Sequence, residues 1–132
     1  MADLRTPGSA DELVEIIAEA RAGRRRIEVI GGGTKRGIGA VAAPDLLLAM
    51  DGMDRVVDYA PEELVLTVQA GAPLAAIETL VAGHGQMLAF EPPHLGRLLG
   101  AKGKATIGGT VAANLSGPRR IKAGAARDHV LG

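Results

Sequence analysis

A short apolar run followed by a glycine triplet constrains the fold of this chain more than any other stretch. Residues 27–30 are β-branched at three of four positions, which predicts a buried strand. The glycines at 31–33 follow at once, and Thr34 and Lys35 come next. Glycine permits positive φ and lets the backbone lie directly against a ligand. The strand is therefore predicted to end in a tight loop, the glycine loop, that carries a hydroxyl and a cation.

Two interpretations of the glycine loop stay open. Successive backbone N–H groups in such a turn form a concavity that binds anions, which favours a phosphate or pyrophosphate. A tight turn without a ligand uses the same residue types. The P-loop is excluded, because it requires lysine before serine or threonine and here Thr34 precedes Lys35.

A second glycine pattern, G-x-G-x-x-A, occupies residues 37–42. It neither follows a strand directly nor opens a helix, since Pro44 comes two residues later. We interpret this dinucleotide-type match as chance. No helix dipole is then expected to support the glycine loop, and backbone donors with Lys35 must bind the anion.

Composition limits the classes of function. The 132 residues suit one domain or part of a larger one, with 47% hydrophobic and only 2% aromatic residues. Fifteen basic and fifteen acidic residues produce no net field that attracts nucleic acid. The absence of cysteine excludes disulfides, a thiolate nucleophile and cysteine metal sites. No apolar run approaches the ~18 residues of a membrane span, so a cytoplasmic protein is expected.

The remaining patterns predict an α+β fold. Ser9 and Glu12 form a capping box for an amphipathic helix that ends at Gly23. Short strands are predicted at 45–50, 55–59 and 64–70, and a second helix at 73–83. This mixed order does not suit a regular βαβ winding.

Two histidines and a small-residue stretch complete the candidates. His84 and His94 have no third ligand at metal spacing, so a metal role is not expected for either. Residues 108–113 are small and predict a short helix on which a flat group can rest. Close helix–sheet packing explains these glycines almost as well. It explains the polar side chains that follow less well, and loops with such groups often carry function: Asn114, Ser116, Arg119 and Arg120.

Three segments together resemble a known family: residues 27–37, 105–120 and 124–132. They resemble the FAD-binding domain of the vanillyl-alcohol oxidase superfamily, the PCMH-type domain. Within it, residues 91–93 (Glu-Pro-Pro) and 108–120 are most similar to the FAD-binding subunits of glycolate oxidases. The resemblance implies a two-lobed α+β fold with FAD between a first lobe of about 1–70 and a second lobe starting at about 71. Such domains usually continue beyond the equivalent of Gly132, so a partial domain is expected here.

The resemblance also implies which residues bind FAD. It assigns one group to the pyrophosphate loop and another to the flavin side of the cofactor. Without cysteine in the chain or histidine in the glycine loop, non-covalent FAD is expected. The pyrophosphate group is Gly31, Gly32, Gly33, Thr34, Lys35 and Gly37, and the flavin-side group is Pro92, Gly108, Gly109, Thr110, Ala113, Asn114 and Gly117.

Two further expectations concern individual side chains. A valine at Gly32 is expected to abolish FAD binding, because it opposes positive φ and blocks close approach. Arg119, Arg120 and Arg127 are interpreted as support residues, with ion pairing to Asp128 favoured over ligand contact.

The implied function is part of a flavin-dependent oxidoreductase that oxidises a 2-hydroxy acid such as glycolate, together with companion subunits. No residue is nominated as a catalytic base. One alternative is a non-catalytic flavin-binding or structural module that needs partner subunits. Another is an ATP-dependent enzyme, which the order of Thr34 and Lys35 disfavours.

Overall fold

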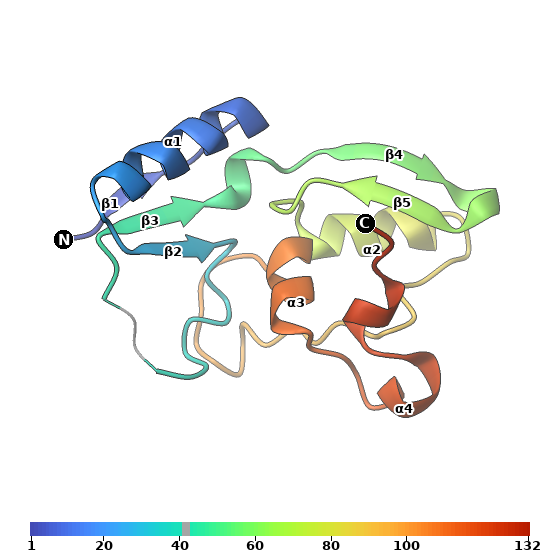
Figure 1. Cartoon of the computed structure of the whole chain (residues 1–132). Helices are drawn as coiled ribbons and strands as arrows, with labels where there is room; N and C mark the ends of the chain where they lie inside the picture. Colours follow the sequence, from blue (N-terminus) through green and yellow to red (C-terminus); the bar gives the residue numbers. More distant parts are fainter. Residues whose placement is uncertain (41–42) are drawn as a thin grey trace.

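Two small sheets organise the chain in a computed structural model that describes residues 1–40 and 43–132. The first sheet is parallel, with β3 (Leu46–Ala49) between β1 (Asp3–Arg5) and β2 (Ile27–Ile30). The second is an antiparallel hairpin of β4 (Val56–Ala60) and β5 (Val65–Val68). The predicted α+β class is confirmed (Figure 1). Val41 and Ala42, which end the second glycine pattern, lie outside the described residues.

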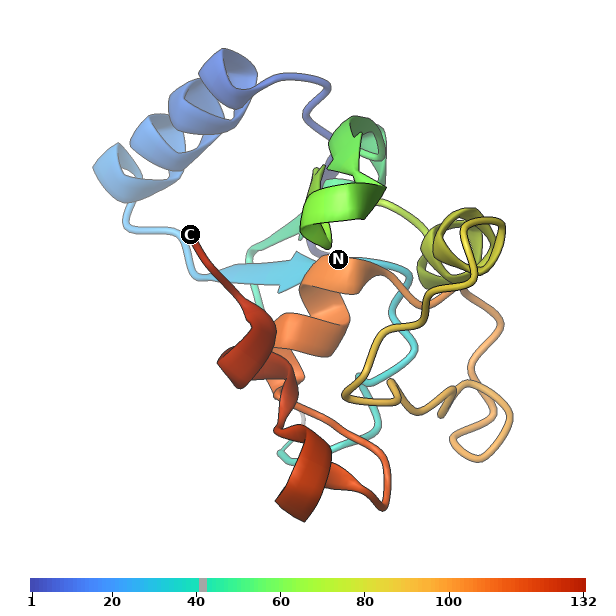
Figure 2. The ribbon, with the colours of Figure 1, turned by 90° about the vertical axis from the view of Figure 1, so that its right-hand side faces the viewer.

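Four α-helices are described, and the predicted ones are confirmed near their expected positions. In Figure 1, α1 lies over the three-stranded sheet and α2 lies below the hairpin. Figure 2 shows β2 pointing toward α3, which Figure 1 places between the sheet and α4. None of the described helices is long and apolar enough to cross a membrane. The helices are α1 (Ala10–Ala22), α2 (Leu74–Ala82), α3 (Ile107–Ala113) and α4 (Arg120–Ala123), with short 3₁₀ turns at Met50–Gly52, Pro61–Glu63 and Ala126–His129.

Helix α1 packs on the sheet through the apolar stripe that the sequence predicts. Ile16 and Ala20 are buried against Leu46 and Leu48 of β3. Ser9 caps the helix by accepting a hydrogen bond from the Glu12 amide at 3.2 Å. In a capping box the Glu12 carboxylate would accept from the Ser9 amide. Here it accepts from the amide of the preceding residue, Gly8.

The parallel pairing and strand β1 were not predicted from the sequence. At three exposed residues, β1 is too short to show an alternating pattern. Strand β3 lies between two parallel partners and under α1, which explains its uninterrupted apolar run. The βαβ unit therefore exists, although only in the first third of the chain.

Backbone hydrogen bonds tie the start of α2 to the start of α3. The amide of Leu74 donates to the carbonyl of Ala105 at 2.9 Å, and the amide of Ile107 donates to Ala72 at 3.0 Å. The amide of Gly108 donates to Ala70 at 2.9 Å. Leu74 is itself fully buried. These bonds hold the beginning of α3 in a fixed position, at the end of the parallel sheet.

Asp45 and Arg26 connect the beginnings of β2 and β3. The Asp45 carboxylate accepts from the Arg26 backbone amide at 2.8 Å and from two guanidinium nitrogens at 3.1 Å each. These hydrogen bonds lower the pKa of Asp45 from 3.8 to about 2. A depressed carboxylate pKa contributes stability above pH 3.8 that is lost as the pH falls toward 2.

We therefore expect Asp45→Asn to reduce the dependence of unfolding free energy on pH between about 4 and 2. Urea unfolding at a series of pH values measures this slope. The matched control is Asp54→Asn, because Asp54 is exposed and forms no ion pair with any described residue. An equal change of slope in both variants would contradict the assignment to Asp45.

Candidate functional site

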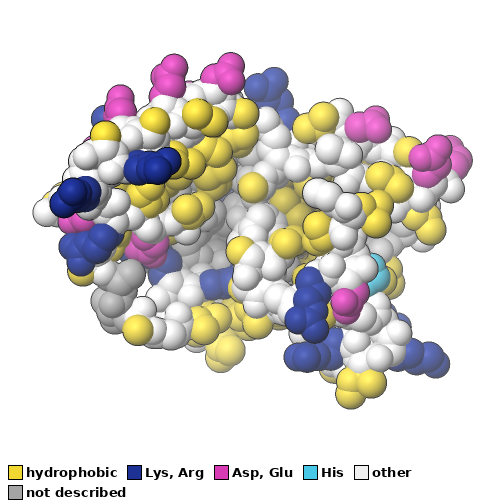
Figure 3. Space-filling view, in the orientation of Figure 1, with side chains coloured by type: hydrophobic (Ala, Val, Ile, Leu, Met, Phe, Trp, Pro, Cys, Tyr) yellow, Lys and Arg dark blue, Asp and Glu magenta, His cyan; other side chains and the backbone are white. Residues whose placement is uncertain are grey.

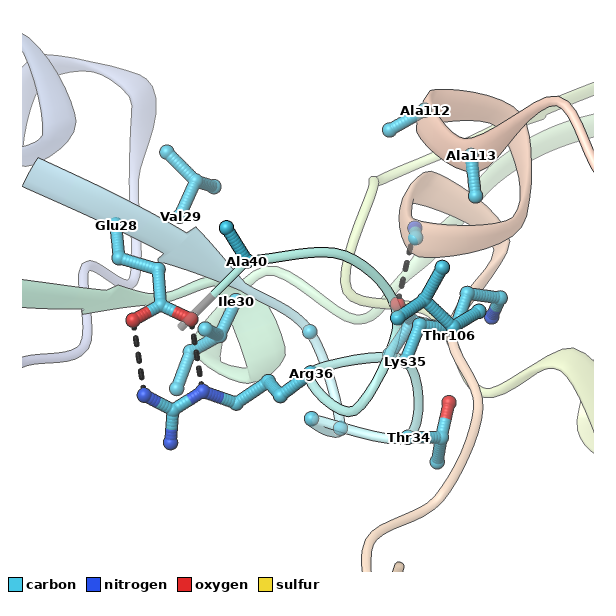
Figure 4. Close-up of a pocket in the computed structure, with 15 residues that line it drawn as sticks. Glu28, Val29, Ile30, Thr34, Lys35, Arg36, Ala40, Thr106, Ala112 and Ala113 are labelled. Carbon is cyan, nitrogen blue, oxygen red and sulfur yellow. Dashed lines mark hydrogen bonds and ion pairs between the residues drawn. The ribbon is translucent and has the colours of Figure 1, made fainter. Parts of the chain in front are cut away.

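A cavity of about 490 Å³ opens where β2 runs into the glycine loop and meets α3. Figure 3 shows the hollow between the three-stranded sheet and α3. Figure 4 shows Glu28 and Arg36 meeting at one end, with Lys35 and Thr106 at the other end, beside α3. The lining residues are Glu28, Val29, Ile30, Gly31, Gly32, Gly33, Thr34, Lys35, Arg36, Ile38, Ala40, Thr106, Gly109, Ala112 and Ala113.

The three glycines meet different structural requirements. Only Gly33 has positive φ, at +68°. A Cβ at Gly31 would overlap the Thr106 side chain, and a Cβ at Gly32 would overlap the carbonyl oxygen of Lys104. The expectation that Gly32 needs positive φ is therefore wrong. The close approach that requires glycine at 32 is to the backbone of Lys104, which the sequence alone does not indicate.

The beginning of α3 forms the wall opposite the glycine loop. Thr106 caps α3, with its hydroxyl accepting from the Gly109 amide at 3.3 Å. The fully buried hydroxyl of Thr110 donates to the Thr106 carbonyl at 3.0 Å. Because Thr106 lies against Gly31, the N-terminal end of a helix does face the loop. The prediction that no helix supports the loop is wrong, since this helix comes about 75 residues later in the sequence.

Lys35 is the cation held inside this cavity. Its Nζ lies 4.0 Å from the position that a Cβ on Gly109 would take. Partial burial lowers the pKa of Lys35. No ion pair between described residues includes Lys35. A half-buried ammonium without a carboxylate partner is stabilised when an anion enters.

The neighbouring cation, Arg36, has a protein partner instead. Its guanidinium donates two hydrogen bonds to the Glu28 carboxylate, at 2.7 and 2.8 Å. The pair raises the pKa of Arg36 and lowers that of Glu28. This bidentate contact ties the far side of the glycine loop back to β2. It leaves Lys35 as the cation available to an anion in the cavity.

The structure brings together seven of the thirteen sequence-predicted binding residues in the cavity lining. They are Gly31, Gly32, Gly33, Thr34, Lys35, Gly109 and Ala113.

The other six do not line this cavity, and their surroundings explain why. A Cβ on Gly108 would lie 2.6 Å from the Ala70 carbonyl oxygen, and a Cβ on Gly117 would lie 2.5 Å from the side-chain Cβ of Glu91. Asn114 ends α3 in the left-handed conformation, and its side-chain oxygen accepts from the Arg127 amide at 3.0 Å. Gly37 has open space around it. The remaining two, Pro92 and Thr110, are buried.

Sequence reasoning missed eight lining residues. Thr106 carried a usable signal, because threonine directly before a helix is a preferred N-cap. The exposed position of Val29, in an apolar strand, carried none. The missed residues are Glu28, Val29, Ile30, Arg36, Ile38, Ala40, Thr106 and Ala112.

The predicted pairing of arginines with Asp128 is confirmed for Arg127 and wrong for Arg119. Arg119 pairs with Glu91 at 2.9 Å, so pairing of Arg119 with Asp128 is wrong. Arg127 lies 3.9 Å from Asp128, the outermost range of an ion pair. The second Asp128 oxygen accepts from the Ala125 amide at 2.8 Å. None of these residues lines the cavity.

Comparison with known proteins identifies the family. The model of a family described as "FAD binding domain" matches residues 2–132. The chain belongs to this family. Its cofactor is FAD, which agrees with the cofactor expected from the sequence. A glycine loop beside Lys35, with apolar residues further along the cavity, suits a dinucleotide of this kind.

Similar proteins support the same family, and a solved structure supports the fold. The chain is 49% identical to the glycolate oxidase subunit GlcE of Escherichia coli over 77 residues, which are 58% of this chain and 20% of that protein. It is 32% identical to D-2-hydroxyglutarate dehydrogenase of Xanthomonas citri pv. viticola over 127 residues, 96% of this chain and 25% of that protein. A structure of alkyldihydroxyacetonephosphate synthase superposes over 97% of this chain and 23% of its own, with a TM-score of 0.73 and 22% identity. That structure supports the fold, and the chain spans a quarter or less of each of these proteins.

Proposed function

We propose that the cavity between the glycine loop and α3 binds the diphosphate of FAD. The observation that carries the proposal is Lys35, a half-buried ammonium without an ion-pair partner among the described residues, beside a loop of three glycines. The backbone amides of the loop and the Lys35 ammonium are all positively polarised hydrogen-bond donors, which suit a negatively charged diphosphate. Val29, Ile30 and the small residues of α3 supply an apolar surface for a flat ring.

The assignment of individual residues to FAD follows from this geometry. Gly31, Gly32, Gly33, Thr34 and Lys35 would lie against the diphosphate, and Gly109 and Ala113 would lie along the flavin side of the cofactor. Pro92, Gly108, Thr110, Asn114 and Gly117, which the sequence also suggested, would act by shaping the backbone around the site. Gly37, the remaining suggested residue, has open space around it and would accept a side chain. The two-lobed arrangement, divided at about residue 70 with FAD between the lobes and held non-covalently, is part of the same proposal.

The protein containing this domain is proposed to oxidise a 2-hydroxy acid. The support is similarity to a glycolate oxidase subunit and to a D-2-hydroxyglutarate dehydrogenase, both named for 2-hydroxy acids. Bound FAD would accept the two electrons removed from the substrate. The residues of this chain would bind and orient the cofactor. Companion subunits and a cytoplasmic location are further parts of the proposal.

The absorption spectrum of the purified chain, recorded after FAD is added and the protein desalted, tests cofactor binding. We expect flavin bands to remain with the protein. Denaturation should release all the flavin into the supernatant, because no covalent bond is expected. Thermal unfolding with FAD or with ATP separates the alternatives. Stabilisation by FAD supports the proposal. Stabilisation by ATP and not by FAD would contradict it and favour an ATP-dependent enzyme.

A further inference from the structure

The Glu28–Arg36 ion pair joins the two sides of the glycine loop. Glu28 belongs to β2, which runs into the loop, and Arg36 comes directly after Lys35. Figure 4 shows the two side chains meeting beside the loop, with two hydrogen bonds between them. The Arg36 side chain also packs along the turn, since its Cδ lies 3.6 Å from the position that a Cβ on Gly33 would take. The pair therefore connects β2, the end of the loop and the glycine with positive φ.

The backbone of the loop has few restraints of its own. Its internal hydrogen bonds run from the Arg36 amide to the Gly33 carbonyl at 3.5 Å and from the Ile38 amide to the Lys35 carbonyl at 3.0 Å. The amides of residues 32–35 donate to no described residue. These amides can face an anion, but consecutive glycines have no intrinsic preference for this conformation and lose conformational entropy when they adopt it. Side-chain contacts must therefore supply part of the order.

The geometry of the pair is that of a strong ion pair. The Glu28 side chain is only 20% exposed, and Arg36 donates to both of its carboxylate oxygens, at 2.7 and 2.8 Å. A bidentate contact of this kind is stronger than an ordinary surface ion pair. Close packing of Gly31 and Gly32 already fixes the first half of the loop, so the pair restrains the second half. Because its two charges cancel, the pair orders the site without adding net charge beside Lys35.

We infer that Glu28 and Arg36 are positioning residues of the cofactor site: their pair holds the second half of the glycine loop in the conformation in which its amides face the diphosphate. The inference rests on the proposed function, which assigns the diphosphate to this loop. A loop that is ordered before FAD arrives loses less conformational entropy on binding. Without the pair, only a fraction of the molecules has the loop ready, and the dissociation constant for FAD rises by the inverse of that fraction. The rise appears in the association rate constant, while dissociation from the formed complex is unchanged.

Glu28→Gln is the deciding variant, because charge and positioning predict opposite results for it. The variant leaves the Arg36 cation beside an anionic ligand, so charge alone would tighten FAD binding. We expect weaker binding instead, by about fivefold, and a similar loss in Arg36→Gln. Stopped-flow fluorescence of the flavin should show slower association and an unchanged dissociation rate constant in both variants. The exchanged pair, Glu28→Arg with Arg36→Glu, should recover most of the affinity. Arg26→Gln is the matched control, because Arg26 forms a similar pair with Asp45 at the beginning of β2 and does not line the cavity.

Tighter binding by Glu28→Gln, or faster dissociation from either variant, overturns the inference, since charge or direct contact with FAD would then explain the pair. Affinities equal to that of the wild type in both variants also overturn it and leave the proposed function standing. A wild-type chain that takes up no FAD refutes the proposed function instead. Hydrogen exchange of the amides at 32–35, measured without FAD, then decides whether the pair orders the loop: faster exchange in both variants supports this role, and unchanged exchange overturns it.

Discussion

Gly32→Val is expected to remove FAD from the desalted protein. The valine side chain would occupy the space of the Lys104 carbonyl oxygen, so residues 103–104 must move away from the loop. The two backbones are closely packed, because a Cβ on Gly103 would in turn overlap the Gly32 carbonyl. Forcing additional methyl groups into packed structure costs about 1–3 kcal/mol, which corresponds to as much as a hundredfold in affinity. Fluorescence titration with FAD measures the loss.

Gly37→Val is the matched control in the same loop. Gly37 has no neighbour within 4 Å of a potential Cβ, and its φ is not positive. The control should keep FAD affinity within about threefold, because it adds the same side chain to open space. Equal losses at both positions would show that the loop tolerates no side chain for a reason other than contact with Lys104. Circular dichroism of both variants separates loss of the site from loss of the fold.

Lys35→Ala is expected to weaken FAD binding about tenfold or more while leaving the apo protein at least as stable as before. A hydrogen bond to a charged group contributes about 1.5–3 kcal/mol. In the apo protein, partial burial lowers the pKa of Lys35, so the ammonium is destabilising below that pKa and the cost declines as the pH rises. The variant should therefore lose FAD affinity without losing folding stability. Titration calorimetry and thermal unfolding measure the two quantities.

The role of Lys35 also predicts the direction in which FAD affinity changes with pH. Binding needs the protonated ammonium, so affinity should fall as the pH rises through the lowered pKa of Lys35, and this fall should disappear in Lys35→Ala. Affinity should also decrease with salt if the contact is open to solvent. Lys122→Ala on α4 is the control, because Lys122 does not line the cavity. A large loss that is independent of salt, together with lower apo stability, would show that Lys35 is structural.

Local patterns in the sequence were sufficient for most of the secondary structure. Ser9 before an apolar stripe begins α1, and Gly23 ends it, because capping and helical periodicity involve residues within one or two turns. The strand at 27–30 and the glycines after it were predicted for the same reason. The resemblance added FAD, and the family match confirms that cofactor.

Long-range contacts decided the shape of the site. The side chain that fills the space beside Gly31 is Thr106, and the backbone that excludes a side chain at Gly32 belongs to Lys104. Glu28 and Arg36 form their pair only because the loop folds back along β2. A pattern of residues determines periodicity and local conformation, whereas which backbones touch depends on packing between segments far apart in the chain. The sequence by itself therefore predicted a strand that ends in a tight glycine loop, and the family resemblance assigned that loop to the pyrophosphate. Only the tertiary structure decided that the wall opposite the loop is the start of α3.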